Sequence, residues 1–120
     1  MSKKTVVIGA STKPDRYAYK ATVALLERHH DTVPVGIREG EINGTKILTG
    51  KPEVKEVDTV TLYVGPQNQP ELYNYINELK PKRVIFNPGT ENPEFVSLLQ
   101  KNNIEALEAC TLVLLSIGNY

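Results

Sequence analysis

Short apolar runs, most of them rich in β-branched residues, recur along the chain and alternate with segments of helical periodicity. The runs cover residues 5–8, 32–35, 59–64, 83–86 and 104–107. Runs of this length are typical of strands buried on both faces of a parallel sheet. We therefore predict five strands, with helices in the intervening segments.

Different sequence signals predict the helices: apolar periodicity for two of them and capping residues for the third. Apolar positions on one broad face predict a helix from about Tyr17 to His29. Leu72, Tyr75, Ile76 and Leu79 follow an i, i+3, i+4, i+7 pattern, which predicts a second helix with Pro70 in its first turn. Asn92 and Pro93 are good N-cap and first-turn residues for a third. The last apolar run, 112–117, fits either a strand or a short helix.

The order of these elements defines the fold class. Alternating strands and helices imply right-handed βαβ units and an open sheet. We predict a three-layer, Rossmann-like α/β domain over residues 1–120, with a mainly parallel, doubly wound sheet of about five strands. Asn43-Gly44 is a type I′ turn signal and predicts a small hairpin outside the main sheet.

Composition and sequence patterns limit the classes of function that we expect for this protein. Fourteen basic residues balance fourteen acidic ones, which argues against non-specific nucleic-acid binding. The sequence shows no signal-peptide pattern, no apolar stretch of membrane-spanning length and no metal-ligand spacing, so we expect a cytoplasmic protein without a membrane or metal partner. The single cysteine, Cys110, cannot form an internal disulfide.

The topology predicts where a ligand binds. In open α/β sheets, ligands bind beyond the carboxyl ends of the strands, where the strand order reverses. The loops at that edge are 9–16, 36–40, 65–69 and 87–92. They are rich in Gly, Pro, Asn and charged residues, which can present backbone groups to a ligand.

The first of these loops gives the strongest signal. Gly9, Ala10 and Ser11 add little side-chain bulk, and the helix that follows offers free N–H groups and a partial positive charge to a phosphate. Arg16 could add a bidentate contact. The alternative is a plain strand-to-helix turn with a surface arginine.

The second loop bears on ligand identity. The G-x-G-x-x-G pattern of dinucleotide-binding proteins is missing, and Arg38 stands where an acidic residue would bind the ribose of NAD. An arginine there suits the ribose 3′-phosphate of coenzyme A or the 2′-phosphate of NADP, or it is simply solvated. In the fourth loop, Asn87, Pro88 and Gly89 line the pocket or serve only loop geometry and helix capping.

No catalytic set stands out. His29 and His30 end a helix away from the predicted site. Cys110 has no histidine in the predicted site to act as its base, and a buried structural role is the better interpretation. Glu105 and Glu108 are expected to point to opposite faces, so they form no obvious acid–base pair.

The residues resemble the family of stand-alone CoA-binding domain proteins. The resemblance rests on the run Val7–Ser11 with Pro14, Arg16 and Tyr17, on Val33-Pro34-Val35, and on the Asn43-Gly44 turn, and it extends through Cys110. The same fold forms the CoA-binding part of the succinyl-CoA synthetase α subunit.

The resemblance implies binding of coenzyme A or a related adenine nucleotide, with no established reaction. It places the phosphates at residues 9–11, flanked by Arg16 and Tyr17, and the adenine or pantetheine along Val64 and Pro66. Two stretches depart from the family: Gly36-Ile37 replaces a common Asn-Pro, and Asn87-Pro88-Gly89 stands where many members have Gln-x-Gly.

We therefore predict a module that binds coenzyme A or an acyl-CoA, without catalysis of its own. The alternatives are a small enzyme that uses NADP or an acyl-CoA, with Cys110 or Glu108 taking part, and a regulatory domain that has lost its ligand. The predicted ligand contacts are Gly9, Ala10, Ser11, Pro14, Arg16, Tyr17, Gly36, Arg38, Val64, Pro66, Asn87, Pro88 and Gly89.

Overall fold

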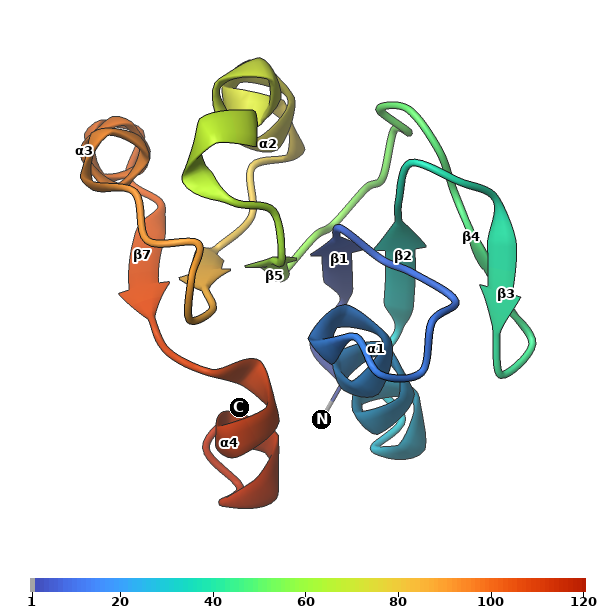
Figure 1. The fold of residues 1–120 in the computed structure, drawn as a ribbon. Helices are drawn as coiled ribbons and strands as arrows, with labels where there is room; N and C mark the ends of the chain where they lie inside the picture. The colour runs from blue at the N-terminus through green and yellow to red at the C-terminus, as the bar shows by residue number, and fades with distance from the viewer. Residues whose placement is uncertain (1) are drawn as a thin grey trace.

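The chain folds around a five-stranded parallel sheet, as the alternation of strands and helices predicted. A computed structural model describes residues 2–120. The strands of the main sheet are β1 (Thr5–Ile8), β2 (Thr32–Val35), β5 (Thr59–Leu62), β6 (Arg83–Phe86) and β7 (Glu105–Glu108). Their order is β2-β1-β5-β6-β7, and every pairing is parallel (Figure 1). The strand order reverses between β1 and β5, so the crevice predicted for a ligand lies there.

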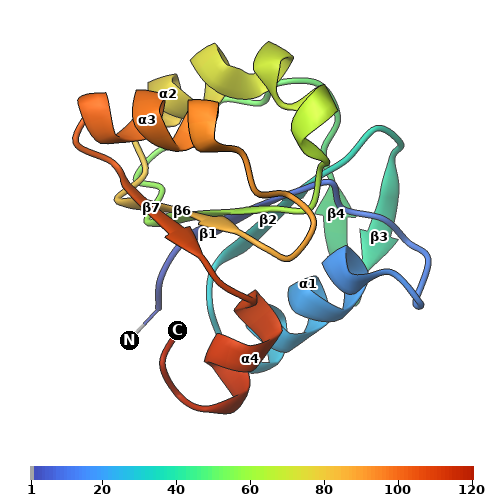
Figure 2. The same cartoon turned by 60° about the vertical axis from the view of Figure 1, so that its left-hand side comes forward.

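Helices cover both faces of this sheet. They are α1 (Tyr17–Glu27), α2 (Tyr73–Leu79), α3 (Pro93–Lys101) and α4 (Thr111–Ser116). Figure 2 shows α2 and α3 on one face, with α1 and α4 on the other. The Rossmann-like, three-layer prediction is confirmed. Within the described residues, no helix is both long enough and apolar enough to cross a membrane.

The strand register explains the two cores. Val6, Val60 and Val84 form one row across β1, β5 and β6, and they pack toward α2 and α3. Val7, one residue further along β1, packs instead with Ala18 and other residues of the α1 and α4 layer. Successive residues of a strand point to opposite faces, and helices cover both faces, so the central strands carry apolar residues on each face.

A hairpin extends beyond the edge of the sheet at β2. It consists of β3 (Gly40–Ile42) and β4 (Thr45–Ile47), which pair antiparallel and form their own two-stranded sheet. Asn43 and Gly44 both have positive φ, 47° and 82°, as a type I′ turn requires. The predicted hairpin outside the main sheet is confirmed.

Several element ends differ from the prediction. The third strand of the main sheet ends at Leu62 rather than Val64, and the first helix ends at Glu27 because His29 adopts a left-handed conformation, with φ of 62°. Two 3₁₀ turns, Pro66–Asn68 and Pro70–Leu72, precede α2, so Pro70 lies ahead of that helix. The final run, left open between strand and helix, is the short helix α4.

Candidate functional site

The first and third loops meet at the point where the strand order reverses. Gly9 follows β1 with φ of 97°, and a Cβ atom there would lie 2.9 Å from the backbone oxygen of Tyr63, the residue after β5. Only glycine combines this positive φ with so close an approach. The backbones of the two loops therefore touch across the predicted crevice.

The two amides at the start of the first loop are used inside the protein. The N–H groups of Gly9 and Ala10 both donate to the carbonyl oxygen of Val35, each at 2.9 Å. This contact ties the end of β1 to the end of β2. The sequence suggested that residues 9–11 would hold phosphates as a unit, but these two N–H groups already have an acceptor and contribute the shape of the loop.

The free donors lie further along the chain. The backbone N–H groups of Ser11, Thr12, Tyr17, Ala18 and Tyr19 have no acceptor within residues 2–120. Arg16, the N-cap of α1, makes no side-chain capping bond, and the first turn of α1 contains no acidic residue. An uncapped N-terminus keeps its partial positive charge and its orphan donors available to an anion.

The charged side chains around these donors are Lys13, Asp15 and Arg16. The Ser11 hydroxyl accepts a hydrogen bond from the Lys13 amide at 3.1 Å, which leaves its own proton available to a ligand. Pro14, Arg16 and Tyr17 are exposed on the same turn. Within the part of the chain that the structure describes, the guanidinium of Arg16 makes no ion pair.

The second loop packs closely against the first at both of its ends. A Cβ atom on Gly36 would lie 2.3 Å from the Ala10 oxygen, and one on Gly40 would lie 2.5 Å from Cγ2 of Thr12. Residues 37–39 therefore form a short arch anchored on either side of Ser11. Arg38 lies at the middle of this arch, exposed and without an ion pair among residues 2–120.

The third and fourth loops are joined by a side chain that sequence reasoning missed. Gln69 is fully buried, and its Nε2 donates to the carbonyl oxygens of Val64 at 2.9 Å and Thr90 at 2.8 Å. Its Oε1 accepts from Asn92 at 2.9 Å. Nothing in the polar stretch around Gln69 distinguishes a buried glutamine from an exposed one. The result is a rim on which Val64 is half-buried and Pro66 exposed.

Asn87, the residue after β6, links β5 to α4 through hydrogen bonds of its side chain. Its Nδ2 donates to Oγ1 of Thr61 at 2.7 Å and to the Leu62 oxygen at 2.8 Å, and its Oδ1 accepts from the Thr111 amide at 2.9 Å. The residue is only 1% exposed. These bonds use the donors and acceptor of the amide, so Asn87 is a structural residue of the site. Pro88 and Gly89, which follow it, are exposed at the rim.

Tyr63 follows β5 and Cys110 lies shortly after β7, at the same edge of the sheet. Cys110 is the half-buried N-cap of α4. The Tyr63 hydroxyl is buried without a hydrogen-bond partner among the described residues, and burial raises the pKa of this phenol to about 12. The phenol therefore stays protonated at neutral pH.

The histidines lie away from this edge, as expected. His30 accepts a hydrogen bond at Nδ1 from the Lys3 amide at 2.9 Å, ahead of β1, and burial lowers the pKa of His30. Within residues 2–120, no group of three or more His, Cys, Asp or Glu side chains is placed to hold a metal ion.

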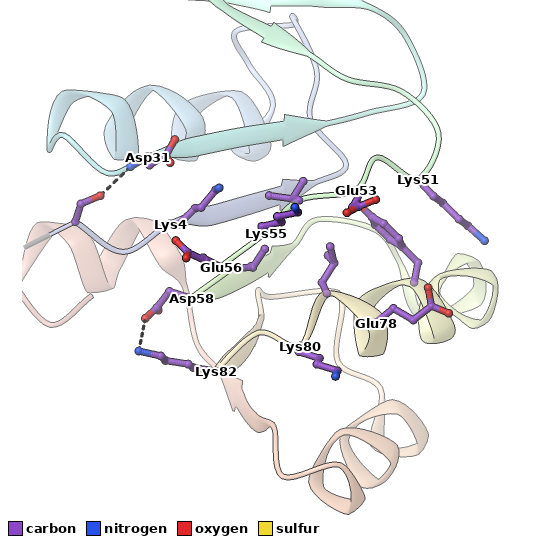
Figure 3. Close-up of a pocket in the computed structure, with 15 residues that line it drawn as sticks. Lys4, Asp31, Lys51, Glu53, Lys55, Glu56, Asp58, Glu78, Lys80 and Lys82 are labelled. Atoms are coloured by element: carbon purple, nitrogen blue, oxygen red, sulfur yellow. Dashed lines mark hydrogen bonds and ion pairs between the residues drawn. The ribbon is translucent and has the colours of Figure 1, made fainter.

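A groove at the opposite edge of the sheet has a different character. It runs past the amino ends of the strands, and Figure 3 shows the charged side chains along it. They are Lys4, Lys51, Lys55, Lys80 and Lys82 together with Asp31, Glu53, Glu56, Asp58 and Glu78. Five positive charges face five negative ones, so this groove offers no net attraction to an anion.

The fold and the reversal of strand order define this chain as a Rossmann-like α/β protein with open loops at the carboxyl edge. The chain belongs to the family described as "CoA binding domain", whose sequence profile matches residues 3–116. The family resemblance placed the phosphates of the ligand at residues 9–11, but the amides of residues 9 and 10 are hydrogen-bonded within the protein.

Solved structures agree with this assignment. A crystal structure of an uncharacterized protein is 51% identical over 100% of this chain and 99% of that one, with a TM-score of 0.97. A conserved hypothetical protein from Pyrococcus furiosus is 27% identical over 92% of this chain and 97% of that one, with a TM-score of 0.81. Cell-free ID.343 from Thermus thermophilus is 21% identical over 99% and 91%, with a TM-score of 0.87, and so shows the shared fold. Comparison with curated proteins gave no match.

Proposed function

We propose that this protein binds coenzyme A at the carboxyl edge of its sheet, with the diphosphate at the start of α1. The supporting observation is the set of backbone N–H groups without acceptors, at Ser11, Thr12 and the first turn of α1, in a member of a CoA-binding family. These donors point to an anionic ligand because an uncapped helix N-terminus favours negative charge. The exposed Arg16 guanidinium adds a bidentate, charge-assisted contact.

Arg38 would bind the ribose 3′-phosphate. It lies on the arch anchored beside Ser11, one loop away from the diphosphate donors. In folds of this kind, the residue after the second strand contacts the ribose, and an arginine accommodates a phosphate there. The 2′-phosphate of NADP presents the same charge at the neighbouring ribose position, which makes NADP the ligand to compare with coenzyme A.

The pantetheine arm would extend along the rim formed by the third and fourth loops. Val64 and Pro66 supply apolar surface on one side, and Pro88 and Gly89 lie exposed on the other. We propose binding without catalysis. In this proposal Cys110 takes no part in a reaction, since the histidines lie at the far edge and cannot act as its base.

Calorimetric titration with coenzyme A, acetyl-CoA, dephospho-CoA and NADP tests the proposal. We expect coenzyme A and acetyl-CoA to bind with similar affinity, and both to bind more tightly than NADP. No heat with any of these ligands at millimolar concentration would refute the proposed function.

A substitution then tests the phosphate assignment. Arg38→Ala should weaken coenzyme A by about tenfold, the value of one charge-assisted contact, and leave dephospho-CoA nearly unchanged. Arg28→Ala is the matched control, because Arg28 is an exposed arginine at the other end of α1. Equal losses of coenzyme A and dephospho-CoA in Arg38→Ala would remove Arg38 from the 3′-phosphate.

A further inference from the structure

One histidine lies where residues from both ends of the sequence come together at the amino edge of the sheet (Figures 1 and 2). Nδ1 of His30 accepts a hydrogen bond from the Lys3 amide at 2.9 Å. The His30 ring also packs edge-on against the ring of Tyr120, with the two centroids 5.0 Å apart. A single imidazole therefore contacts the segment before β1 and the segment after α4.

Tyr120 holds the segment after α4 against the sheet. Its hydroxyl shares a hydrogen bond with Oγ1 of Thr5, and its carbonyl oxygen accepts from Nζ of Lys3 at 2.6 Å. The guanidinium of Arg83 lies over its ring, 4.5 Å from the centroid. Residues 116–119 are exposed whereas Tyr120 is half-buried, so the attachment of this segment depends on Tyr120.

The hydrogen bond from Lys3 requires a neutral imidazole. Nδ1 can accept only while it carries no proton, so the hydrogen of the neutral His30 ring is on Nε2. Protonation makes both ring nitrogens donors, and two N–H groups would then face each other where the hydrogen bond now lies. The charge on His30 therefore decides whether this contact can exist.

The surroundings of His30 favour its neutral form. Burial lowers the pKa of His30, and Lys3 before β1, Arg83 at the start of β6 and Arg28 after α1 lower it further. The remaining titratable group against the ring is the phenol of Tyr120, whose pKa burial raises, so it stays uncharged. An imidazolium here would stand among three cations.

The carboxylates of this edge do not neutralise that cluster. Asp31, the residue after His30, is exposed. Asp58 accepts from Oγ1 of Thr59 at 2.7 Å, and Oγ1 of Thr59 in turn accepts from Nε of Arg83 at 2.8 Å. Nη2 of Arg83 is buried without an acceptor among residues 2–120. Arg83 thus has only an indirect link to a carboxylate, through a hydroxyl group.

We propose that His30 is a pH-sensitive latch, whose neutral ring holds Lys3 and Tyr120 together and whose protonation releases them. The latch fastens the far end of α4 to the amino edge. The near end of α4 is held at the carboxyl edge, where the Thr111 amide donates to Asn87. Acid therefore leaves α4 attached at one edge only. This inference is independent of ligand binding.

The test follows both partners of His30 by NMR between pH 7.5 and pH 4.5. We expect the ¹⁵N–¹H heteronuclear NOE of Tyr120 to fall to about half its neutral value, while that of Leu115 within α4 stays unchanged. Hydrogen-exchange protection of the Lys3 amide should fall about tenfold, because the amide loses its acceptor. Both changes should occur below pH 6.5, since the folded state lowers the pKa of His30 from that value.

Three variants separate charge from shape. His30→Asn offers an oxygen to the Lys3 amide but does not titrate, so it should keep Tyr120 ordered at pH 4.5. His30→Lys carries its charge throughout this range and should release Tyr120 already at pH 7.5. His29→Asn is the matched control, because it removes the exposed histidine of the same turn, and it should keep the transition of the wild type. Circular dichroism checks that each variant is folded.

The outcomes decide the proposal. Release of Tyr120 at low pH in the wild type and in His29→Asn, but not in His30→Asn, would support the latch. The same transition in His30→Asn would overturn it, because another group would then be responsible. An ordered Tyr120 in the wild type at pH 4.5, or in His30→Lys at pH 7.5, would overturn it as well.

Discussion

The two edges of the sheet are closed by different kinds of loop, although the same strands end at both. At the carboxyl edge, glycine is the recurrent residue of the loops, and five of the eight glycines lie there: Gly9, Gly36, Gly40, Gly65 and Gly89. At the amino edge, the turns that follow the first three helices place non-glycine residues in the left-handed region. These residues are His29, Lys80 and Asn103, with φ between 51° and 62°.

The difference shows that loops at the carboxyl edge require residues without a side chain. Gly9, Gly36 and Gly40 each bring a loop so close to its neighbour that a Cβ atom would collide with it. The same edge carries the N–H groups without acceptors at the start of α1. At the amino edge, a non-glycine residue in the left-handed region costs about 1 kcal/mol. No close contact of the described residues at that edge makes a glycine necessary. The predictions below test this contrast.

The largest effect is expected from Asn87, which supports the carboxyl edge from within. Asn87→Leu keeps the volume of the side chain but removes the bonds to the Leu62 oxygen and the Thr111 amide. It also leaves Oγ1 of Thr61 with only the Thr111 hydroxyl as its side-chain partner. We expect the free energy of unfolding in urea to fall by about 3 kcal/mol. Asn102→Leu is the control, because the exposed Asn102 amide bonds mainly to the Leu98 oxygen, and it should cost under about 1 kcal/mol. Similar losses for both variants would contradict a special role for Asn87.

The next effect separates backbone strain from close approach. Gly9→Ala should lower the free energy of unfolding by about 3 kcal/mol, because it adds a collision with Tyr63 to the strain of a positive φ. Gly50→Ala should cost only about 1 kcal/mol, since Gly50 has φ of 74° but nothing within 4 Å of its built Cβ. Urea denaturation of both variants gives the comparison, and equal costs would show that the approach of the two loops is not tight.

At the amino edge, we expect substitution by glycine to stabilise the folded protein. Lys80 ends α2 with φ and ψ both 51°, so Lys80→Gly should raise the free energy of unfolding by about 1 kcal/mol. Lys55→Gly, at an exposed position without a positive φ, should lower it by about 0.5 kcal/mol through the entropy of the unfolded chain. Thermal denaturation of the two variants measures the difference. A loss of stability in Lys80→Gly would mean that this edge does depend on its side chain.

The smallest effect at neutral pH concerns Tyr63. Tyr63→Phe should change the free energy of unfolding by less than about 0.5 kcal/mol at pH 7, because the buried hydroxyl has no partner to lose. The folded state raises the pKa of this phenol from 10 to about 12, so the wild type keeps this contribution below pH 10 and loses it as the pH rises toward 12.

Denaturation between pH 9 and 12 measures this effect. The alkaline loss should be smaller in Tyr63→Phe, and Tyr17→Phe, which alters a largely exposed tyrosine, should keep the loss of the wild type. An unchanged slope in Tyr63→Phe would show that Tyr63 does not titrate in this range.

The sequence predicted the features that depend on local pattern. The β-branched runs placed all five strands of the main sheet within two residues, and Asn43-Gly44 located the hairpin turn. The carboxyl edge followed from topology alone. The final helix stayed open between strand and helix because the short run 112–117, apolar at five of its six positions, has no distinguishing period.

The long-range contacts of the site were beyond sequence reasoning. The Val35 oxygen accepts from both Gly9 and Ala10, across 25 or more residues, so the free amides begin only at Ser11. Gln69 and Asn87 are buried amides whose partners come from distant strands and loops. No local pattern distinguishes such residues from exposed ones, since their burial is decided by tertiary packing.

Binding of coenzyme A at the carboxyl edge can be followed through the backbone amide resonances in a ¹⁵N–¹H correlation spectrum during titration with coenzyme A. We expect the largest shifts at Ser11, Thr12, Tyr17 and the arch 37–39. Shifts concentrated instead at Lys4, Lys55 and Lys80, in the groove at the amino edge, would contradict it.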